Sequence, residues 1–249
     1  FVFTNTKSPI ADLYYYSSGD KTDGDDHFKA RFATNINKQA GIGFDIDYIY
    51  ARGFYRNQSH SSFGATLYGS YRGDQYQMHS FYTTGYTKNL ENGGIEDENY
   101  INDMPMRLEG VRNNVSIDKF FLTHRYSMGF YEKSDSTGRI VSRSLKATSD
   151  TTTNRKSTKL VDPKGNIIPD SLLITKFVPV ASIIHTANIE SNYRTFSSQK
   201  NIDNYFISSP YLSGKIANDS THYISVQNTV ALEMREGFRK WVKTGMRLF

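Results

Sequence analysis

Apolar and polar residues alternate over most of this chain, as they do in β-strands whose two faces meet different surroundings. The segment GIGFDIDYIYARG, Gly41 to Gly53, is the clearest case. Its even-numbered positions from Ile42 to Tyr50 are aliphatic or aromatic, while Asp45 and Asp47 have the opposite parity. The alternation alone leaves two possibilities open. The apolar ribbon faces a protein core, as in a soluble sandwich, or it faces lipid, as in a membrane barrel.

Period-two runs recur along the chain and helical periodicity is hard to find, so the predicted fold class is all-β. The runs predict strands at Ile10–Ser17, Phe28–Asn37, Ile42–Phe54, Ser62–Arg72, Tyr76–Lys88, Phe120–Tyr131, Lys176–Phe196, Tyr223–Arg235 and Phe238–Leu248. Globular strands average about five or six residues, whereas tilted membrane-spanning strands need about 9 to 11. Several predicted strands exceed ten residues. The lengths therefore favour an antiparallel transmembrane β-barrel, of which about nine strands are seen here.

The connections between the predicted strands alternate in length. Short turns are expected at Asn37–Gly41, Arg72–Gln75 and Arg235–Phe238, and long links at Asn89–Lys119 and Ser197–Thr221. Membrane barrels alternate in this way, with short turns at one rim and long loops at the other. Residues 132–175 break the alternation. We expect a long inserted loop there, with a turn at Lys164-Gly165-Asn166, within a single barrel domain that covers residues 1–249.

The polar parity of the strands carries mostly small or hydroxylated residues, which suit a crowded, wet interior better than a bulk-solvated surface. Opposite charges on such a wall either set a transverse field across a channel or pair with each other and fill the interior; both possibilities remain open. The pore-lining candidates are Lys29, Arg31, Asp45, Asp47, Thr66, Tyr68 and Ser70. Aromatic residues near strand ends are expected in the membrane girdles. These candidates are Tyr48, Tyr50, Tyr71 and Trp241.

Composition removes several classes of protein. The 249 residues have a mean hydropathy of -0.58 but include 18 Tyr and 16 Phe, too many aromatic residues for a disordered chain. No stretch is apolar for 18 residues, which excludes a transmembrane helix. The absence of cysteine removes disulfides, thiolate catalysis and cysteine-ligated zinc. The net charge of +5 lies largely in Arg139–Lys164, which we interpret as a solvated basic loop and not as a nucleic-acid-binding arm.

Few residues suggest catalysis or metal binding. Asp20, Asp23, Asp25 and Asp26 lie in DKTDGDDH, but not in the order of an EF-hand, so we interpret them as a solvated acidic loop. The histidines include no pair at metal-binding spacing, and a zinc site would need ligands from different strands. No nucleophile motif is present. The sequence therefore predicts no enzyme, no catalytic residue, no metal and no cofactor.

Two motifs resemble those of a known family. They are an Arg-Gly-x-Tyr-x-Asn-Gln corner, at Arg52, Gly53, Tyr55, Asn57 and Gln58, and a loop Asn92-Gly93-Gly94-Ile95. With HRYSMGFYE from His124, FVPVASIIHTANIESNYRTF from Phe177 and EGFRKWVKTGMRLF from Glu236, they resemble the "putative porin" family of Bacteroidota outer membranes. The resemblance implies an outer-membrane β-barrel that is exported with a signal peptide and inserted by the barrel-assembly machinery. It supplies no catalytic residues.

Two departures from that family indicate a piece of a longer protein. The chain has no leader, and about nine strands is an odd number where bacterial single-chain barrels have even numbers. The parity of Phe249 matches Trp241, Lys243 and Arg247, which argues against a carboxy-terminal membrane signal.

The expected location is the bacterial outer membrane. The expected partners are outer-membrane lipid and lipopolysaccharide, the assembly machinery and small polar solutes, with no nucleic acid. Neither the oligomeric state nor the rim that faces outward is predicted. Three functions stay open: a passive channel for small hydrophilic solutes, a structural or loop-mediated binding barrel, and a soluble secreted β-sandwich that binds glycans.

Overall fold

The structure is a computed structural model that describes residues 3, 6–19, 24–97, 99, 104–134, 140–144, 174–200, 202, 205, 216–234 and 247–248. Its strands are β1 (Ile10–Ser17), β2 (Asp25–Asn35), β3 (Ala40–Arg52), β4 (Ser59–Arg72), β5 (Tyr76–Glu91), β6 (Val111–Ser134), β7 (Ile140–Ser144), β8 (Ile174–Ser197), β9 (Asn218–Met234) and β10 (Arg247–Leu248). None of the described residues belongs to a helix that is long and apolar enough to cross a membrane.

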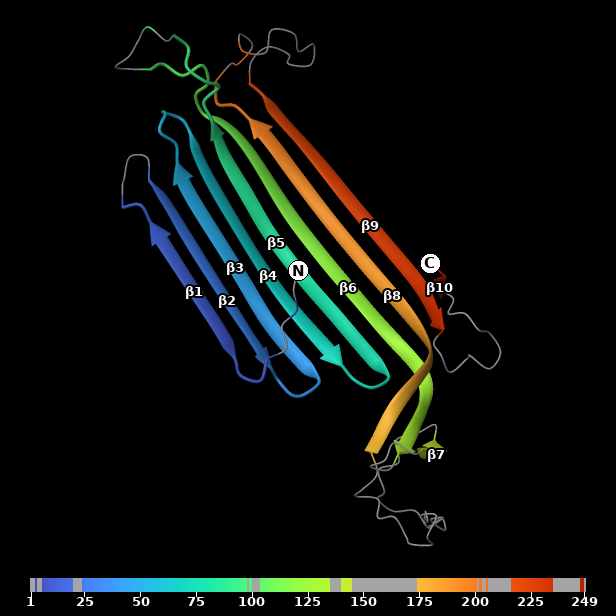
Figure 1. The fold of residues 1–249 in the computed structure, drawn as a ribbon. Coiled ribbons are helices and arrows are strands. Elements are labelled where there is room, and N and C mark those ends of the chain that lie inside the picture. Colours follow the sequence, from blue (N-terminus) through green and yellow to red (C-terminus); the bar gives the residue numbers. More distant parts are fainter. Residues whose placement is uncertain are drawn as a thin grey trace. The chain divides into compact units, whose positions relative to one another are not determined.

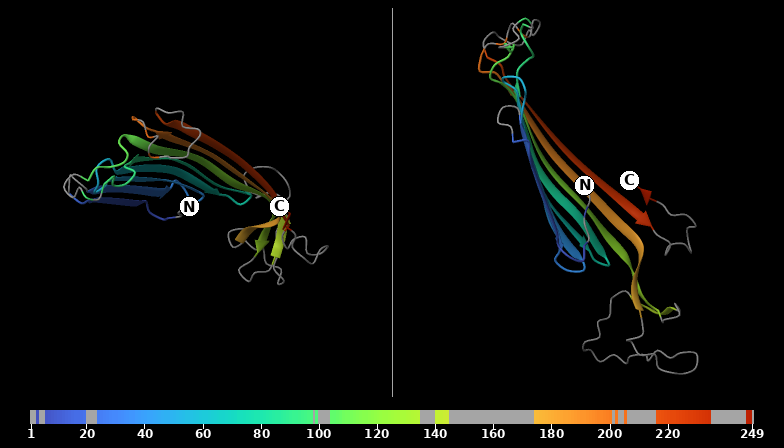
Figure 2. Two further views of the ribbon diagram at one scale, coloured as in Figure 1. Left: turned by 90° about the horizontal axis from the view of Figure 1, so that it is seen from above. Right: turned by 60° about the vertical axis from the view of Figure 1, so that its left-hand side comes forward.

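All of these strands belong to one sheet. Its order is β1-β2-β3-β4-β5-β6-β8-β9-β10, and β7 pairs with β6. Apart from β7, neighbours in sequence are therefore neighbours in the sheet, and β1 to β5 lie side by side in every view (Figures 1 and 2). The prediction of an all-β antiparallel fold is confirmed. The closure of the sheet into a barrel stays a prediction.

The chain divides into two compact units. Unit 1 contains Phe1–Tyr71, His79–Leu122 and Thr186–Asn228, and unit 2 contains Arg72–Met78, Thr123–His185 and Thr229–Phe249. The single barrel domain over residues 1–249 stays a prediction. So does the inserted loop at 132–175, into which β6 and β7 both extend. Its turn at Lys164-Gly165-Asn166 lies outside the described residues.

Most predicted strand bounds are wrong by three residues or fewer, and those of β1 are correct. The largest difference is at β6, which begins at Val111 and not at Phe120. The first half of β6 carries polar residues at both odd-numbered and even-numbered positions, so no alternation of apolar and polar residues indicated a strand there. β9 likewise begins at Asn218, before the predicted Tyr223. Of the predicted strand Phe238–Leu248, only β10 lies among the described residues.

The predicted alternation of short turns and long links is seen from β1 to β6. The β2–β3 turn is short, and the side-chain oxygen of Asn37 closes it by accepting the backbone N–H groups of Gln39 and Ala40, both at 2.8 Å. The β4–β5 turn is closed by the Gly73 N–H, which donates to the carbonyl of Tyr76 at 2.8 Å. The turn predicted at Arg235–Phe238 lies outside the described residues. The β3–β4 and β5–β6 links are longer.

In unit 1 the strand register gathers apolar side chains on one face. Phe28, Tyr48 and Phe63 stand opposite one another on β2, β3 and β4. The next two rows along the same face are Ala30, Ile46 and Ala65, then Phe32, Phe44 and Leu67. We call these rows and their continuation the apolar face.

The apolar face is open to the surroundings of the protein. Leu67 is 55% exposed on β4, and Leu13 is 76% exposed on β1. A soluble monomer seldom exposes contiguous apolar patches beyond a few hundred Å². A sandwich would cover this face with a second sheet about 10 Å away, but all described strands belong to one sheet. The apolar ribbon of GIGFDIDYIYARG therefore lies on an uncovered face that is suited to contact lipid.

Candidate functional site

The opposite face of β2 and β3 carries a row of ion pairs. The Arg31 Nε donates to Asp45 Oδ2 at 2.8 Å. Asp47 accepts from Lys29 Nζ at 3.3 Å and lies 2.8 Å from His27 Nε2. We call this surface of unit 1 the polar face. The basic side chains of these ion pairs lie on β2 and the acidic ones on β3, so the sign of the charge changes across this strand pair.

These ion pairs are in reach of water. The side chains of Lys29 and Arg31 are 42% and 46% exposed, that of Asp47 is 37% exposed and that of Asp45 is 18% exposed. Exposed pairs of this kind contribute little to stability because water and salt screen them. Their main physical effect is therefore on the electrostatic potential above the face, which is the property that a channel wall uses.

The pore-lining candidates predicted from the sequence share this face. Register places Thr66 opposite Asp45, Tyr68 opposite Gly43 and Ser70 opposite Gly41. The hydroxyl oxygens of Thr66 and Thr83 lie 2.9 Å apart, which continues the polar face onto β5. The seven candidates, Lys29, Arg31, Asp45, Asp47, Thr66, Tyr68 and Ser70, therefore lie on one side of β2, β3 and β4. That they line a pore stays a prediction.

The tyrosines predicted for the membrane girdles lie on the apolar face. Tyr48 and Tyr50 are near one end of β3, and Tyr71 stands opposite Ala40 at the other end. The Tyr71 hydroxyl donates to Gln39 Oε1 in the β2–β3 turn at 3.4 Å, and the Arg52 guanidinium lies 5.6 Å from the Tyr50 ring centroid. Tyr71 and Tyr50 thus each have a polar partner at the strand end, as a ring at a membrane interface requires. Trp241 lies outside the described residues.

The spacing of these tyrosines fits a membrane. From Ala40, opposite Tyr71, to Tyr50 there are ten steps from residue to residue along β3, which at about 3.4 Å each cover roughly 34 Å along the strand. With a tilt of about 40° this becomes about 26 Å along the membrane normal, close to the apolar band of about 25 Å in outer-membrane barrels. The girdle assignment of the three tyrosines remains a prediction that this spacing supports.

The polar face of unit 1 continues across β5, β6 and β8. Asn113 Nδ2 donates to Glu91 Oε1 at 3.4 Å, and Asn113 Oδ1 accepts from Arg194 Nε at 3.1 Å. Further along, Lys119 Nζ and Glu190 Oε2 lie 3.5 Å apart. Amides and charged groups thus form a hydrogen-bonded network on this face, with acidic and basic groups both represented.

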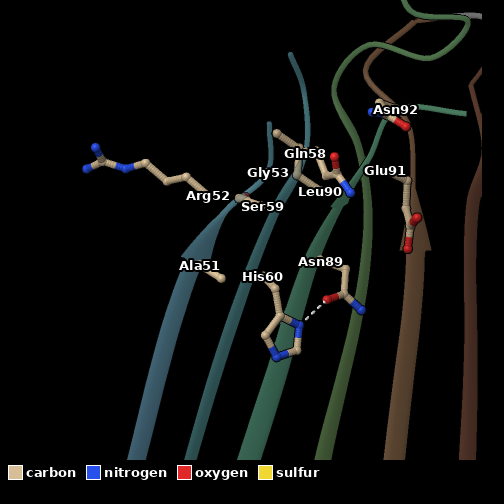
Figure 3. Close-up of a pocket in the computed structure, with 10 residues that line it drawn as sticks. All are labelled: Ala51, Arg52, Gly53, Gln58, Ser59, His60, Asn89, Leu90, Glu91 and Asn92. Carbon is tan, nitrogen blue, oxygen red and sulfur yellow. Dashed lines mark hydrogen bonds between the residues drawn. The ribbon is translucent and has the colours of Figure 1, made fainter. Parts of the chain in front are cut away.

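A pocket of about 380 Å³ lies at the end of β3, β4 and β5. Its lining residues are Ala51, Arg52, Gly53, Gln58, Ser59, His60, Asn89, Leu90, Glu91 and Asn92. His60 Nδ1 and Asn89 Oδ1 are 2.7 Å apart, while Arg52 points away from the other labelled side chains (Figure 3). Register puts His60 opposite Ala51, on the polar face. The pocket therefore offers amide, imidazole and carboxylate groups to a polar molecule.

The Arg-Gly-x-Tyr-x-Asn-Gln motif forms the β3–β4 corner beside this pocket. The Gly53 N–H donates to the carbonyl of Gln58 at 3.0 Å and closes the corner. Asn57 has a φ of 56°, a left-handed conformation that asparagine tolerates better than most residues. Its Nδ2 donates to the carbonyl of Leu108 at 3.4 Å. The motif thus ties the corner to the β5–β6 link, and its role in the structure is architectural.

The Asn-Gly-Gly-Ile motif begins that link. Gly93 and Gly94 have φ values of 67° and 88°, and a Cβ on Gly93 would lie 2.6 Å from Leu108 Cγ and 2.9 Å from the Tyr205 ring. The reversal brings the Leu108 N–H to the carbonyl of Asn92 at 2.9 Å. It also closes a small core below the loops, formed by Leu108, Val111, Ile202 and Ala217 with Phe196. We call the corner, the link and this core the rim cap.

A matched pair of alanine substitutions tests the rim cap. Both Gly93→Ala and Gly94→Ala impose a side chain on a left-handed residue, but only the first meets Leu108, since nothing lies within 4 Å of a Cβ on Gly94. We expect Gly93→Ala to destabilise the cap by about 1–3 kcal/mol more than Gly94→Ala, the usual cost of overpacking. Hydrogen exchange at the Leu108 amide measures the difference. Equal protection in the two variants would contradict the packing described here.

Unit 2 contains its own polar contacts. Ser127 Oγ and Ser182 Oγ are 2.9 Å apart and buried, and Arg125 Nη2 lies 3.1 Å from Glu233 Oε2. On the opposite face of β6 from Arg125 and Ser127, His124 Nε2 lies 3.0 Å from His185 Nδ1. Two histidines from different strands therefore meet, but zinc in proteins usually has three or four protein ligands. Within the described ranges no group of three or more histidine, aspartate or glutamate residues could hold a metal ion.

The acidic loop is shorter than the sequence suggested. Asp25 and Asp26 belong to β2, where they pair in register with Ala51 and Tyr50 of β3. They are therefore strand residues, which corrects their assignment to a loop. Asp20 and Asp23 lie outside the described residues.

Sequence reasoning missed two features of the site. It began the second strand at Phe28 and so did not place His27 beside Asp47, although the parity of His27 matches Lys29 and Arg31. It also treated Asn89–Lys119 and Ser197–Thr221 as long links and did not foresee the core at Leu108. No periodic signal marks that core, because its members come from separate segments. Only the glycines of Asn-Gly-Gly-Ile indicated a compact turn.

One sheet with an exposed apolar face and an opposite face of water-accessible charges defines a porin-like membrane protein. The chain belongs to the family described as "Putative porin", which matches residues 1–249. No curated protein matches the chain. A solved structure described as "Pore forming protein" shares 6% identity and covers 88% of this chain and 95% of its own, with a TM-score of 0.14. A TM-score this low does not support a conclusion about the fold or the function of this chain.

Proposed function

We propose that this protein is an outer-membrane channel for the passive diffusion of small hydrophilic solutes in a Gram-negative bacterium. The observation that carries the proposal is the pairing of two unlike faces on one sheet of unit 1. Apolar side chains are exposed on one face, and the water-accessible pairs of Asp45 and Asp47 lie on the other. The family points to a channel without enzymatic activity.

The mechanism that follows from these faces is simple. Solutes pass the polar face with their hydration largely kept, and selection rests on pore size and on the field of the lumen charges. Lipid and lipopolysaccharide contact the apolar face, because moving its exposed apolar side chains from water into hydrocarbon is favourable. Pairing between strands satisfies the backbone hydrogen-bonding groups there. The barrel-assembly machinery inserts the protein. The polar pocket at the rim cap is the first site that a solute entering from that end would meet.

Planar-bilayer recording of the full-length protein tests the proposal. Insertion events are expected to raise the current in uniform steps, and uncharged sugars of increasing size are expected to reduce the step until they are excluded. The matched control is the same protein unfolded in denaturant and added under identical conditions. An absence of current steps, from protein whose resistance to protease shows that it has folded, would refute a conducting channel.

A further inference from the structure

Three residues of unit 1 are buried in a row across the polar face. Ala33, Gly43 and Tyr68 stand opposite one another on β2, β3 and β4. Ala33 is 0% exposed and Tyr68 is 5% exposed, and Gly43 is buried as well. The ion pairs of the same face, at Asp45 and Asp47, are partly exposed. Something therefore covers the polar face at this one level.

Part of the cover is Tyr68 itself. A Cβ on Gly43 would overlap the Tyr68 ring, so the ring lies across β3 and needs a glycine beneath it. This explains the burial of Gly43. It does not explain the burial of Tyr68, whose own outer surface must be covered by another group.

Phe3, which precedes β1 in the chain, is one such group. Its ring centroid lies 6.0 Å from that of Tyr68 in an edge-to-face arrangement, and 4.8 Å from that of His79. The hydroxyl oxygen of Thr6 is also buried. Phe3 and Thr6 therefore pack against the sheet, and we call these two residues the strap.

The docked Phe3 lies several strands away from β1, the strand that follows it in the sequence. β1 begins at Ile10, which pairs with Ala33 at the level of the buried row. Phe3, seven residues earlier, lies on β4 and β5, and the distance from β1 to β5 is about 19 Å at 4.8 Å per strand. Seven residues reach at most about 25 Å, so the chain that joins Phe3 to Ile10 is long enough to pass over the polar face from β5 to β1.

The site that receives Phe3 is unusually aromatic for this face. The Thr66–Thr83 and His60–Asn89 hydrogen bonds share one antiparallel register, in which Phe81 stands opposite Tyr68. Phe81 in turn stacks on Phe121 of β6, with ring centroids 5.1 Å apart. Aromatic residues thus occupy neighbouring positions on β4, β5 and β6, where the polar face otherwise carries charged and hydroxylated residues.

We propose that the strap is a built-in constriction of the channel, held across the lumen by the docking of Phe3 on Tyr68 and His79. This inference rests on the proposed function, because a constriction requires a pore. A strap lying on the lumen wall reduces the free cross-section at the level of Gly43, and its release widens the pore. The wild-type channel then has a common narrow state and a rare wide state.

Single-channel recording of Phe3→Ala in the full-length protein tests the constriction. Losing two aromatic contacts of ordinary strength raises the fraction of time spent in the wide state by about fivefold or more. The matched control is Phe120→Ala, which removes the same side chain from β6 at the parity opposite to Phe121. Conductance levels and dwell times that are the same in Phe3→Ala, Phe120→Ala and wild type would overturn the constriction.

A second measurement tests the docking without requiring current. Phe3 is replaced by the photoreactive aromatic residue p-benzoylphenylalanine, and the sites of attachment are mapped by mass spectrometry in the folded protein. Attachment to peptides of β4 and β5 that contain Tyr68 or His79 is expected. Attachment elsewhere, or none, overturns the strap. If the adducts form but no variant conducts, the proposed channel fails while the docked strap stands.

Discussion

Arginine at position 65 is expected to destabilise the protein strongly in a membrane, whereas arginine at position 64 is not. Ala65 lies opposite Ile46 on the apolar face, about midway between Tyr50 of β3 and Tyr71 of β4. An arginine on the lipid face of a barrel costs about 2–4 kcal/mol at the bilayer midplane. We therefore expect Ala65→Arg to lower the free energy of unfolding by that amount in phospholipid vesicles.

The neighbouring residue provides the matched control. Gly64 lies on the polar face opposite Asp47, its backbone does not require glycine, and nothing lies within 4 Å of a Cβ placed there. Gly64→Arg adds the same charge to the same strand, one residue away, beside a carboxylate. We expect a change below about 1 kcal/mol, as for most surface substitutions. Denaturant titrations of both variants in vesicles make the comparison, and similar losses would contradict the assignment of the two faces.

Removing the carboxylates of the polar face is expected to make the channel prefer anions. The double substitution Asp45→Asn with Asp47→Asn leaves Lys29 and Arg31 without their partners. At a distance of about 8 Å in water, the interaction energy between one unit charge and a passing ion is about 0.5 kcal/mol, before dissolved salt screens it. Two charges therefore change the ratio of anion to cation permeability by about two- to fivefold, which the reversal potential in a salt gradient measures.

The reciprocal double substitution, Lys29→Gln with Arg31→Gln, should shift the reversal potential in the opposite direction. Together the two variants decide between the possibilities that the sequence left open. If the ion pairs line a water-filled pore, the shifts are opposite in sign. If they fill a packed interior, both variants lose stability and neither changes selectivity.

The faces of the sheet could be predicted from the sequence because they follow from a local rule. In Gly41 to Gly53 the side chains alternate, and the register with β2 and β4 preserves that alternation, so parity alone placed Asp45 and Thr66 together. A shift of one residue would have moved every apolar side chain to the other face, and the pattern excludes this. The short turns also indicated that the strands they join lie next to each other in the sheet.

The rim cap and the strap could not be predicted in this way. The core at Leu108 and Val111 joins segments that are far apart in the sequence, such as the one around Ile202, and none of them is periodic. Phe3 meets His79 across several strands, and a lone aromatic residue before a strand carries no signal of its partner. The start of β6 was missed for a related reason. On the face of β6 that carries Phe120 and Leu122, the earlier positions Arg112, Asn114 and Ser116 are polar, so the apolar pattern does not extend back to the start of the strand.

The central claim is that the polar face of unit 1 lines a conducting pore while the apolar face meets lipid. The chain contains no cysteine, so single cysteines can be introduced at adjacent positions of β4. During planar-bilayer recording, a charged, membrane-impermeant thiol reagent is applied to Thr66→Cys and, separately, to Leu67→Cys. The account predicts that modification changes the current through the Thr66→Cys channel and leaves the Leu67→Cys channel unaffected. Equal responses, or a response at Leu67 alone, would contradict it.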